Sequence, residues 1–179
     1  MTEFDRQLER WSVHHRTELL DWFFVFLSYI GSFGAVWLVL GAVVAFSFRR
    51  PTALPLTFLA VLLGEATSSG LKFSFDRVRP SDRFAEPETL LRVAHTPSFP
   101  SGHAATSFAC AATLARYVPR RAAVALYVLA ASIAWSRVYV GAHYPFDVLV
   151  GAVIGILIAT ALRLLPAVLR RLLPPPQRG

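Results

Sequence analysis

Residues 146–165, FDVLVGAVIGILIATALRLL, decide the fold class of this chain. The segment carries charge only at its two ends, on Asp147 and Arg163. A helix of about 20 residues, rising about 1.5 Å per residue, crosses the hydrocarbon core of a bilayer. The composition agrees: 55% of the 179 residues are hydrophobic and 16% are charged, with a mean hydropathy of +0.50. Soluble domains have about 25% charged residues, so the sequence predicts a membrane protein of one domain.

Four more apolar segments precede this one and extend the prediction to a bundle. We predict an all-α fold, a polytopic transmembrane helix bundle with about five spans. The first span takes in part of the helix before residue 33, and the second begins after a break at Pro51. The five predicted spans are residues 33–48, 54–71, 102–118, 122–135 and 146–165.

The two ends of the chain are predicted to lie outside the bundle. Residues 15–30 are too short an apolar run to span, and their aromatic side chains suit the headgroup level, so we expect an interfacial helix there. The predicted organisation is a polar segment with this helix over residues 1–30, a transmembrane domain over 31–166, and a basic cytoplasmic tail over 167–179.

The net charge of +7 is explained by orientation in the membrane, and we expect no nucleic-acid partner. The arginine pairs at 49–50 and 120–121 and the arginines of the tail all fall on one side of the predicted bundle. The positive-inside rule makes that side cytoplasmic. The polar segment 72–101 and the stretch 136–147 then lie on the outer face of a plasma (inner) membrane, in a periplasmic or extracellular position.

The stretch 136–147, SRVYVGAHYPFD, has the residues needed for a reactive imidazole. Asp147, four residues after His143, can accept the Nδ1 proton and leave Nε2 free to react. Arg137 offers a planar fork of donors that matches an oxyanion such as phosphate. Taken alone, the stretch is also compatible with a helix cap beside a solvated surface histidine.

Two other segments are predicted to meet this stretch on the same membrane face. One contains Lys72, Arg79 and Pro80, and the other is Pro100-Ser101-Gly102-His103. Fixed cations around one point repel each other, and a highly charged anion relieves that repulsion. The helix start at 101–102 adds backbone N–H groups and the positive end of the helix dipole. The combination predicts a phosphate site.

Glu65, inside the second span, is expected to have a structural role beside the hydroxyls of residues 67–69.

These residues resemble a three-part motif. The patterns K-x6-R-P at 72–80, PSGH at 100–103 and SR-x5-H-x3-D at 136–147 match the signature of the type 2 phosphatidic acid phosphatase superfamily. Arg77 also fits the R-x-R-P form common in that family. The family includes bacterial undecaprenyl pyrophosphate and phosphatidylglycerophosphate phosphatases and soluble vanadium haloperoxidases. Many of its membrane members have six spans, whereas five are predicted here.

The resemblance implies a role for each motif residue. His143 would attack phosphorus to form a phosphohistidine, Asp147 would orient it, and His103 would protonate the leaving oxygen and then activate water. The phosphoryl oxygens would be held by Lys72, Arg79, Arg137, Ser101 and Gly102. We expect no metal and no other cofactor, because protein cations take the place of magnesium.

The function predicted is hydrolysis of a membrane lipid phosphate or pyrophosphate, such as a polyprenyl pyrophosphate or a phosphatidylglycerophosphate-like lipid. A phosphotransferase with an acceptor other than water is the alternative enzyme. A membrane protein that only binds an anionic lipid is a third possibility, disfavoured by the two histidines, and haloperoxidase activity is disfavoured by the lipid setting. The sequence names neither the lipid nor the oligomeric state.

Overall fold

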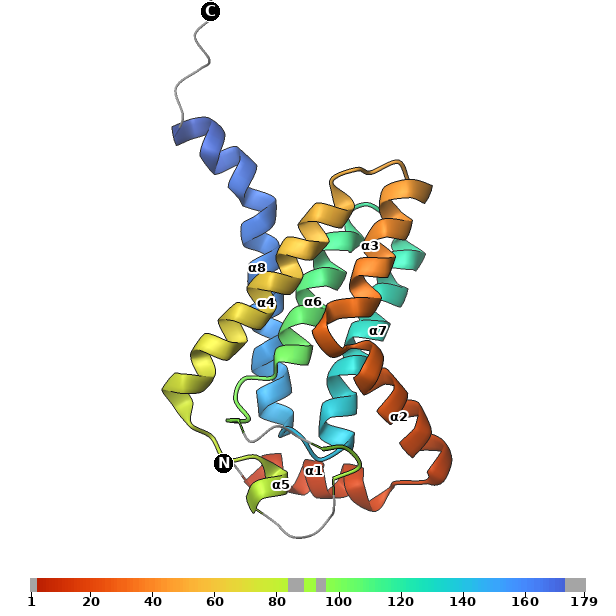
Figure 1. The fold of residues 1–179 in the computed structure, drawn as a ribbon, viewed down its shortest axis with the longest axis vertical. Helices are drawn as coiled ribbons and strands as arrows, with labels where there is room; N and C mark the ends of the chain where they lie inside the picture. Colours follow the sequence, from red (N-terminus) through yellow and green to blue (C-terminus); the bar gives the residue numbers. More distant parts are fainter. Residues whose placement is uncertain (1–2, 84–88, 93–95, 173–179) are drawn as a thin grey trace, which may run out of the picture.

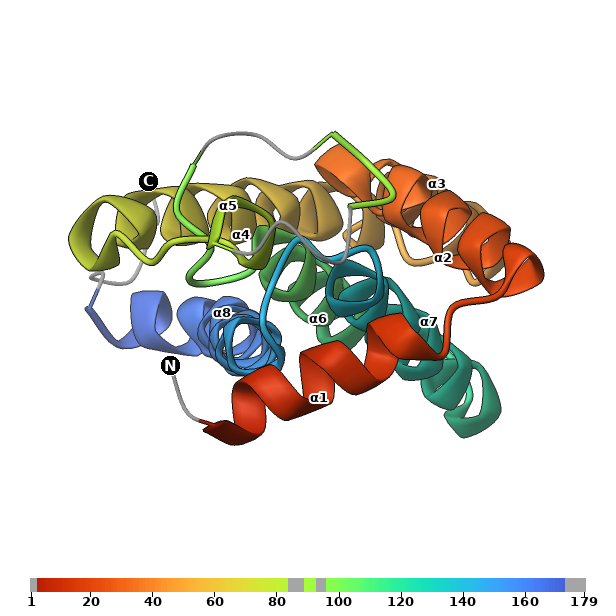
Figure 2. The ribbon, with the colours of Figure 1, turned by 90° about the horizontal axis from the view of Figure 1, so that it is seen from below.

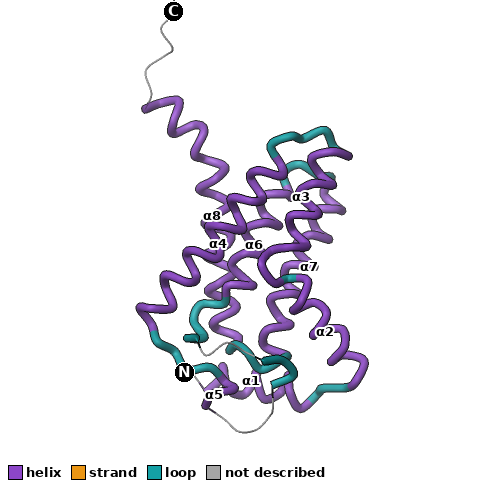
Figure 3. The backbone as a smooth tube through the Cα atoms, in the orientation of Figure 1, coloured by secondary structure: helices purple, strands orange, loops and turns teal. Residues whose placement is uncertain are grey.

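The structure is a computed structural model that describes residues 3–83, 89–92 and 96–172, with side chains described as far as residue 165. All regular structure in these ranges is helical (Figures 1 and 3). The helices are α1 (Glu3–His14), α2 (Glu18–Ile30), the 3-10 turn η1 (Ser32–Gly34), α3 (Ala35–Ser47), α4 (Ala53–Phe75), α5 (Pro80–Arg83), α6 (Gly102–Ala115), α7 (Arg120–Tyr139) and α8 (Pro145–Leu172). The predicted all-α bundle is therefore confirmed.

Helix α6 is the centre of the bundle. It packs against α3, α4, α7 and α8, and small residues dominate its sequence, GHAATSFACAATLA. Ala104, Ala105 and Ala109 are completely buried. Small side chains let neighbouring helix backbones approach closely. Inside a bilayer the hydrophobic effect does not drive helices together, so they associate through such close packing. The position of α6 matters for the site, because its first turn carries the PSGH residues.

Two glycines of α8 allow that helix to lie directly on α6. A Cβ atom added at Gly151 would stand 2.5 Å from the carbonyl oxygen of Ser101, and one at Gly155 would stand 2.3 Å from that of Ala105. Both distances are shorter than a carbon–oxygen contact, so neither position accepts a side chain without a shift of the backbone. This close approach fixes the start of α8 against the start of α6.

The number of spans is confirmed only in part. Three helical segments within the described residues are long and apolar enough to cross a membrane, namely Ala53–Arg83, α7 and Pro145–Leu165. A fourth span is possible if α2 and the Ser32–Ser47 segment, bent by 58° at their junction, count as one. The predicted third span, 102–118, corresponds to α6, which has only 14 residues. The count of five therefore does not follow from helix length and composition.

The N-terminal segment has more structure than the sequence predicted. Residues 3–14, expected only to be polar, form α1, which lies across the lower end of the bundle against α7 and α8 (Figure 2). Asp5 and Glu9 on this helix are buried. The residues of the predicted interfacial helix form α2, which leads into α3 through the bend at η1.

Glu65 has a partner other than the one expected. Its Oε1 accepts a hydrogen bond from Oγ1 of Thr106 on α6 at 3.0 Å. The hydroxyl of Ser68 instead donates to the carbonyl oxygen of Gly64 at 2.7 Å. Glu65 therefore links α4 to α6, in keeping with a structural role.

The arginine-rich turns and the motif residues lie at opposite ends of the bundle. The α3–α4 and α6–α7 turns are at the upper end in Figure 1, together with the C-terminal end of α8. Helices α1 and α5 and the start of α6 are at or towards the other end. This arrangement matches the separation of charge on which the predicted orientation rests.

Candidate active site

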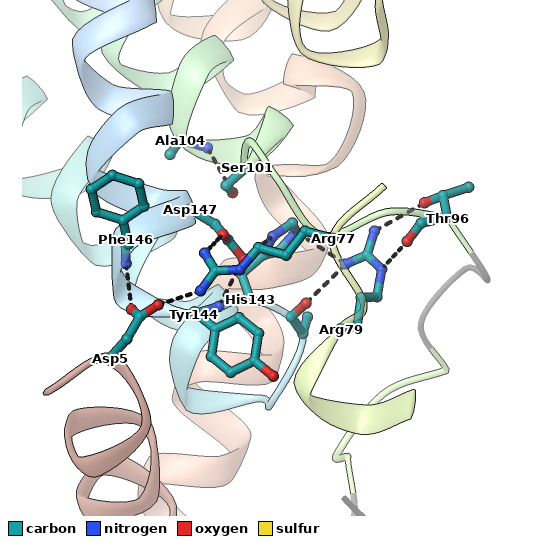
Figure 4. A network of polar contacts seen from close by, with 11 residues as sticks. Asp5, Arg77, Arg79, Thr96, Ser101, Ala104, His143, Tyr144, Phe146 and Asp147 are labelled. Atoms are coloured by element: carbon teal, nitrogen blue, oxygen red, sulfur yellow. Dashed lines mark hydrogen bonds and ion pairs between the residues drawn. The ribbon is translucent and has the colours of Figure 1, made fainter. Parts of the chain in front are cut away.

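His143 lies in the short loop that joins α7 to α8 (Figure 4). The loop turns sharply at Gly141, whose φ of 79° is in the left-handed region that favours glycine. The backbone N–H of His143 then donates to the carbonyl oxygen of Arg137 at 3.0 Å, which ties the loop to the end of α7. Pro145 begins α8, a position where its missing N–H costs nothing. The imidazole is thus held on a short, tethered segment.

The predicted pair of His143 and Asp147 is present at the start of α8. Nδ1 of His143 lies 3.7 Å from Oδ2 of Asp147, and both side chains are buried. This distance exceeds a hydrogen bond, as is common in catalytic pairs without substrate. Burial lowers the pKa of His143 to about 3, and the charge of Arg79 acts in the same direction. The imidazole is therefore neutral near pH 7, with a lone pair on one ring nitrogen.

Arg79 fills the space in front of the other ring nitrogen. Its Nη1 lies 3.2 Å from Nε2 of His143 and donates to the carbonyl oxygen of Ala142 at 2.9 Å. Nε and Nη2 donate to the carbonyl oxygen and the hydroxyl of Thr96, at 2.7 and 3.0 Å. With the Nδ1 proton directed to Asp147, Nε2 is the acceptor for Arg79. A buried guanidinium is thus held in place beside Nε2 of His143.

The start of α6 meets the start of α8 at Asp147. Ser101 caps α6, its hydroxyl accepting from the N–H of Ala104 at 3.5 Å, while its own N–H donates to the carbonyl oxygen of Asp147 at 3.0 Å. A Cβ atom at Gly102 would stand 3.1 Å from Oγ of Ser68, so glycine permits the close approach of α4. The N–H of Ser101 is engaged in the protein, and anion binding at this helix start would use the N–H groups that follow it.

His103 and Arg137 line a polar cavity of about 340 Å³ beside this centre. Nε2 of His103 lies 3.3 Å from the carbonyl oxygen of Ser28 and 3.4 Å from Oγ of Ser32. Nη1 of Arg137 donates to the hydroxyl of Ser28, and its Nε is buried without a protein partner. The remaining residues of the wall are Tyr29, Leu90, Leu91 and Arg92. A buried donor that still needs an acceptor suits an anionic ligand.

Lys72 is a more distant member of the cluster. It lies in the last turn of α4, half-buried, where the charges of Arg79 and Arg137 act on it. Lys72 and His143 are also close enough for their charges to act on the imidazole of His103. The structure therefore brings the predicted site residues to one end of the bundle. Among the described residues, no three His, Cys, Asp or Glu side chains group as ligands for a metal ion.

Several contacts of the site were missed by the sequence analysis. Ser28 and Ser32 contact Arg137 and His103 but were not predicted as site residues. Their spacing of four residues places two hydroxyls on one face of a helix, and this was the only sequence feature that could have indicated them. Thr96 lies in a loop without periodicity, where nothing indicates a partner for Arg79. Asp5 and Arg77 contact each other, and Arg77 contacts Asp147, although the N-terminal segment looked like an ordinary polar one.

The sequence matches a family model over most of the region that holds these residues. The model is that of the PAP2 superfamily, and the match covers residues 53–171. The chain is also 31% identical, over 158 residues, to an undecaprenyl-diphosphatase of Sulfolobus acidocaldarius. That alignment covers 85% of this chain and 73% of the relative.

Two solved structures resemble this one. LpxE of Aquifex aeolicus superposes with a TM-score of 0.81 at 30% identity, covering 90% of this chain and 96% of that chain. A transmembrane PAP2 type phosphatidylglycerolphosphate phosphatase from Bacillus subtilis has the same fold, with a TM-score of 0.76 at 23% identity over 93% of this chain and 86% of that one. The chain therefore belongs to the PAP2 superfamily and is an integral membrane lipid phosphatase of that family.

Proposed function

We propose that this protein hydrolyses a lipid phosphate or diphosphate through a phosphohistidine formed at His143. One observation carries the proposal: a buried, neutral imidazole has Asp147 on its Nδ1 side and a fixed guanidinium on its Nε2 side. A neutral imidazole is nucleophilic, and the cation in front of it would attract a phosphoryl group.

The reaction would run in two steps. Nε2 of His143 attacks phosphorus, the bond from phosphorus to the leaving oxygen breaks, and His103 donates a proton to that oxygen. Water then attacks the phosphorus of the phosphohistidine while His103 takes the water proton, and the P–N bond breaks to release phosphate. With a diphosphate substrate the first leaving group is the lipid monophosphate. The same imidazole serves as acid and then as base, as microscopic reversibility requires.

Arg79, Arg137 and Lys72 would hold the phosphoryl oxygens. Arg79 exchanges its contact with Nε2 for a contact with the substrate, which frees the lone pair for attack. Arg137 has a buried Nε without a protein partner, and the N–H groups of Gly102 and His103, which open α6, add the positive end of a helix dipole. These donors stabilise the charge that a magnesium ion would otherwise neutralise, so we expect metal-independent turnover.

The substrate class follows from the setting of the site and from the relatives. The cavity beside His103 lies at the end of a membrane bundle, where a lipid headgroup can enter. Similarity to an undecaprenyl-diphosphatase supports a polyprenyl diphosphate as the first substrate to test, with a phosphatidylglycerophosphate-like lipid as the second. The charge pattern of the turns supports a site on the outer face of the plasma membrane.

The test is release of inorganic phosphate by the purified protein from each of these lipids, with and without saturating chelator. The proposal expects release from lipid substrate alone, unchanged by chelator and inhibited competitively by orthovanadate. No inorganic phosphate from lipid alone, with the phosphoryl group recovered on an added acceptor alcohol, would indicate a phosphotransferase. A strict requirement for magnesium would contradict the role given to the protein cations.

A further inference from the structure

Helix α1 precedes the region that the family model matches, yet it reaches into the site. Asp5 on this helix is 2% exposed. Its Oδ1 accepts the backbone N–H of Phe146 at 2.9 Å, in the first turn of α8 (Figure 4). Its Oδ2 accepts a hydrogen bond from Nη2 of Arg77. A buried carboxylate outside the motif thus makes one contact at the start of α8, the helix that carries Asp147, and one with Arg77, which follows α4.

Arg77 joins this carboxylate to Asp147. Its Nη2 binds Asp5 and its Nη1 binds Oδ1 of Asp147, so the two arms of one guanidinium hold two carboxylates. The ring of Tyr144 lies beneath the guanidinium, 4.4 Å from its carbon atom to the ring centre. A planar guanidinium held on both arms and on one face has a fixed orientation.

The fixed guanidinium determines which oxygen of Asp147 faces His143. Oδ1 is taken by Arg77, and Oδ2 accepts the N–H of Tyr144 at 3.0 Å while lying 3.7 Å from Nδ1 of His143. Without Asp5, Arg77 would be held by one carboxylate and could draw the Asp147 carboxylate out of this orientation. The Nδ1 proton of His143 would then lose its acceptor for part of the time.

We propose that Asp5 is a positioning residue, which acts through Arg77 to hold Asp147 against the nucleophile, and that α1 is thereby part of the active site. The inference rests on the function proposed above, in which His143 attacks phosphorus. It extends the site beyond the three motifs to the N-terminal helix of this chain.

Asp5→Asn gives the sharpest test. If the single amide oxygen stays on the N–H of Phe146, the NH2 group faces Arg77, and two donors then oppose each other where the carboxylate accepted a hydrogen bond. We expect kcat for phosphate release from a polyprenyl diphosphate to fall about 10-fold, which is typical when a residue that orients an active-site side chain by a hydrogen bond is replaced. KM should change less than about twofold, because the phosphate-binding cations are untouched. Asp5→Glu, which keeps the charge, should retain more activity than Asp5→Asn.

Two controls separate positioning from loss of structure. Glu3→Gln removes an exposed carboxylate from the same helix and should behave as wild type. Hydrogen exchange at the Phe146 amide should stay slow in Asp5→Asn, as expected if α1 remains docked. Arg77→Gln should lower kcat by a similar factor. Adding Asp5→Asn to Arg77→Gln should lower kcat by less than about another twofold, because Asp5 acts on Asp147 through Arg77.

The inference is overturned if Asp5→Asn or Arg77→Gln turns over as fast as Glu3→Gln, or if Asp5→Asn costs the same in both backgrounds. The double variant separates the two explanations even if Asp5→Asn loosens α1. If Asp5→Asn lowered kcat only by disturbing α1, it would lower kcat by the same factor when Arg77 is already replaced. Failure of the proposed function looks different. In that case wild type releases no phosphate from lipid, or His143→Ala keeps its activity.

Discussion

At the scale of single residues, Asp147 connects more of the site than its motif spacing indicates. The spacing of four from His143 predicts the imidazole–carboxylate pair, and the two side chains do meet. Nothing in that spacing shows that the Asp147 carbonyl accepts the N–H of Ser101, or that Arg77 takes its other carboxylate oxygen. Such contacts depend on how segments far apart in the sequence pack together, so they cannot be predicted from the local spacing of residues.

Burial of His143 has a consequence for stability. Its pKa in the folded protein is about 3, below the ordinary value of about 6.5 that the unfolded chain retains. The unfolded chain therefore binds a proton as the pH falls below about 6.5, and the folded protein does not. The contribution to stability is complete above about pH 6.5 and is lost towards pH 3, by at most about 1.4 kcal/mol per pH unit.

We expect thermal unfolding in detergent to shift to lower temperature between about pH 7 and pH 5. His143→Gln should show a smaller shift, because the titrating group is absent. An identical shift in both proteins would show that His143 does not titrate differently on folding.

At the scale of elements, the spans with long apolar runs were predictable and the polar N-terminal helix was not. Residues 54–71 and 146–165 lie within α4 and α8, as expected from hydropathy alone. Helix α1 has no apolar run, and it is placed by Asp5 and other tertiary contacts at the end of the bundle. The central position of α6 also could not be read from its length, although its small residues are typical of a packed interface.

The contact between α6 and α8 can be tested at a single position. Gly155→Ala would place a Cβ atom 2.3 Å from the carbonyl oxygen of Ala105, and we expect a loss of about 1–3 kcal/mol of stability from the overpacking. Gly70→Ala on α4 is the matched control, since a Cβ there meets no atom within 4 Å. It should be neutral or slightly stabilising, because alanine favours a helix. Equal melting temperatures for the two variants would contradict the close packing described.

At the scale of the whole molecule, the separation of charge predicts the orientation in the membrane. The arginines of the α3–α4 and α6–α7 turns lie at the end opposite α1 and α5. From this charge separation the positive-inside rule predicts that the candidate site lies on the outer face.

Single cysteines at Arg83 and Arg120, both exposed, test this orientation directly. An impermeant thiol reagent added to intact cells should label the first and not the second, and the native Cys110 is fully buried and adds little background. The reverse pattern would place the site in the cytoplasm.

The central claim is that His143 becomes covalently phosphorylated, and trapping that intermediate tests it most directly. His103→Ala should still accept phosphate from a radiolabelled substrate with a stable leaving group, such as an aryl phosphate, because such a group needs little protonation. Hydrolysis should then stall, since the base that activates water is missing. We predict acid-labile, base-stable label on His103→Ala and no label on His143→Ala. Label that persists in His143→Ala, or that is acid-stable as a serine ester, would contradict the account.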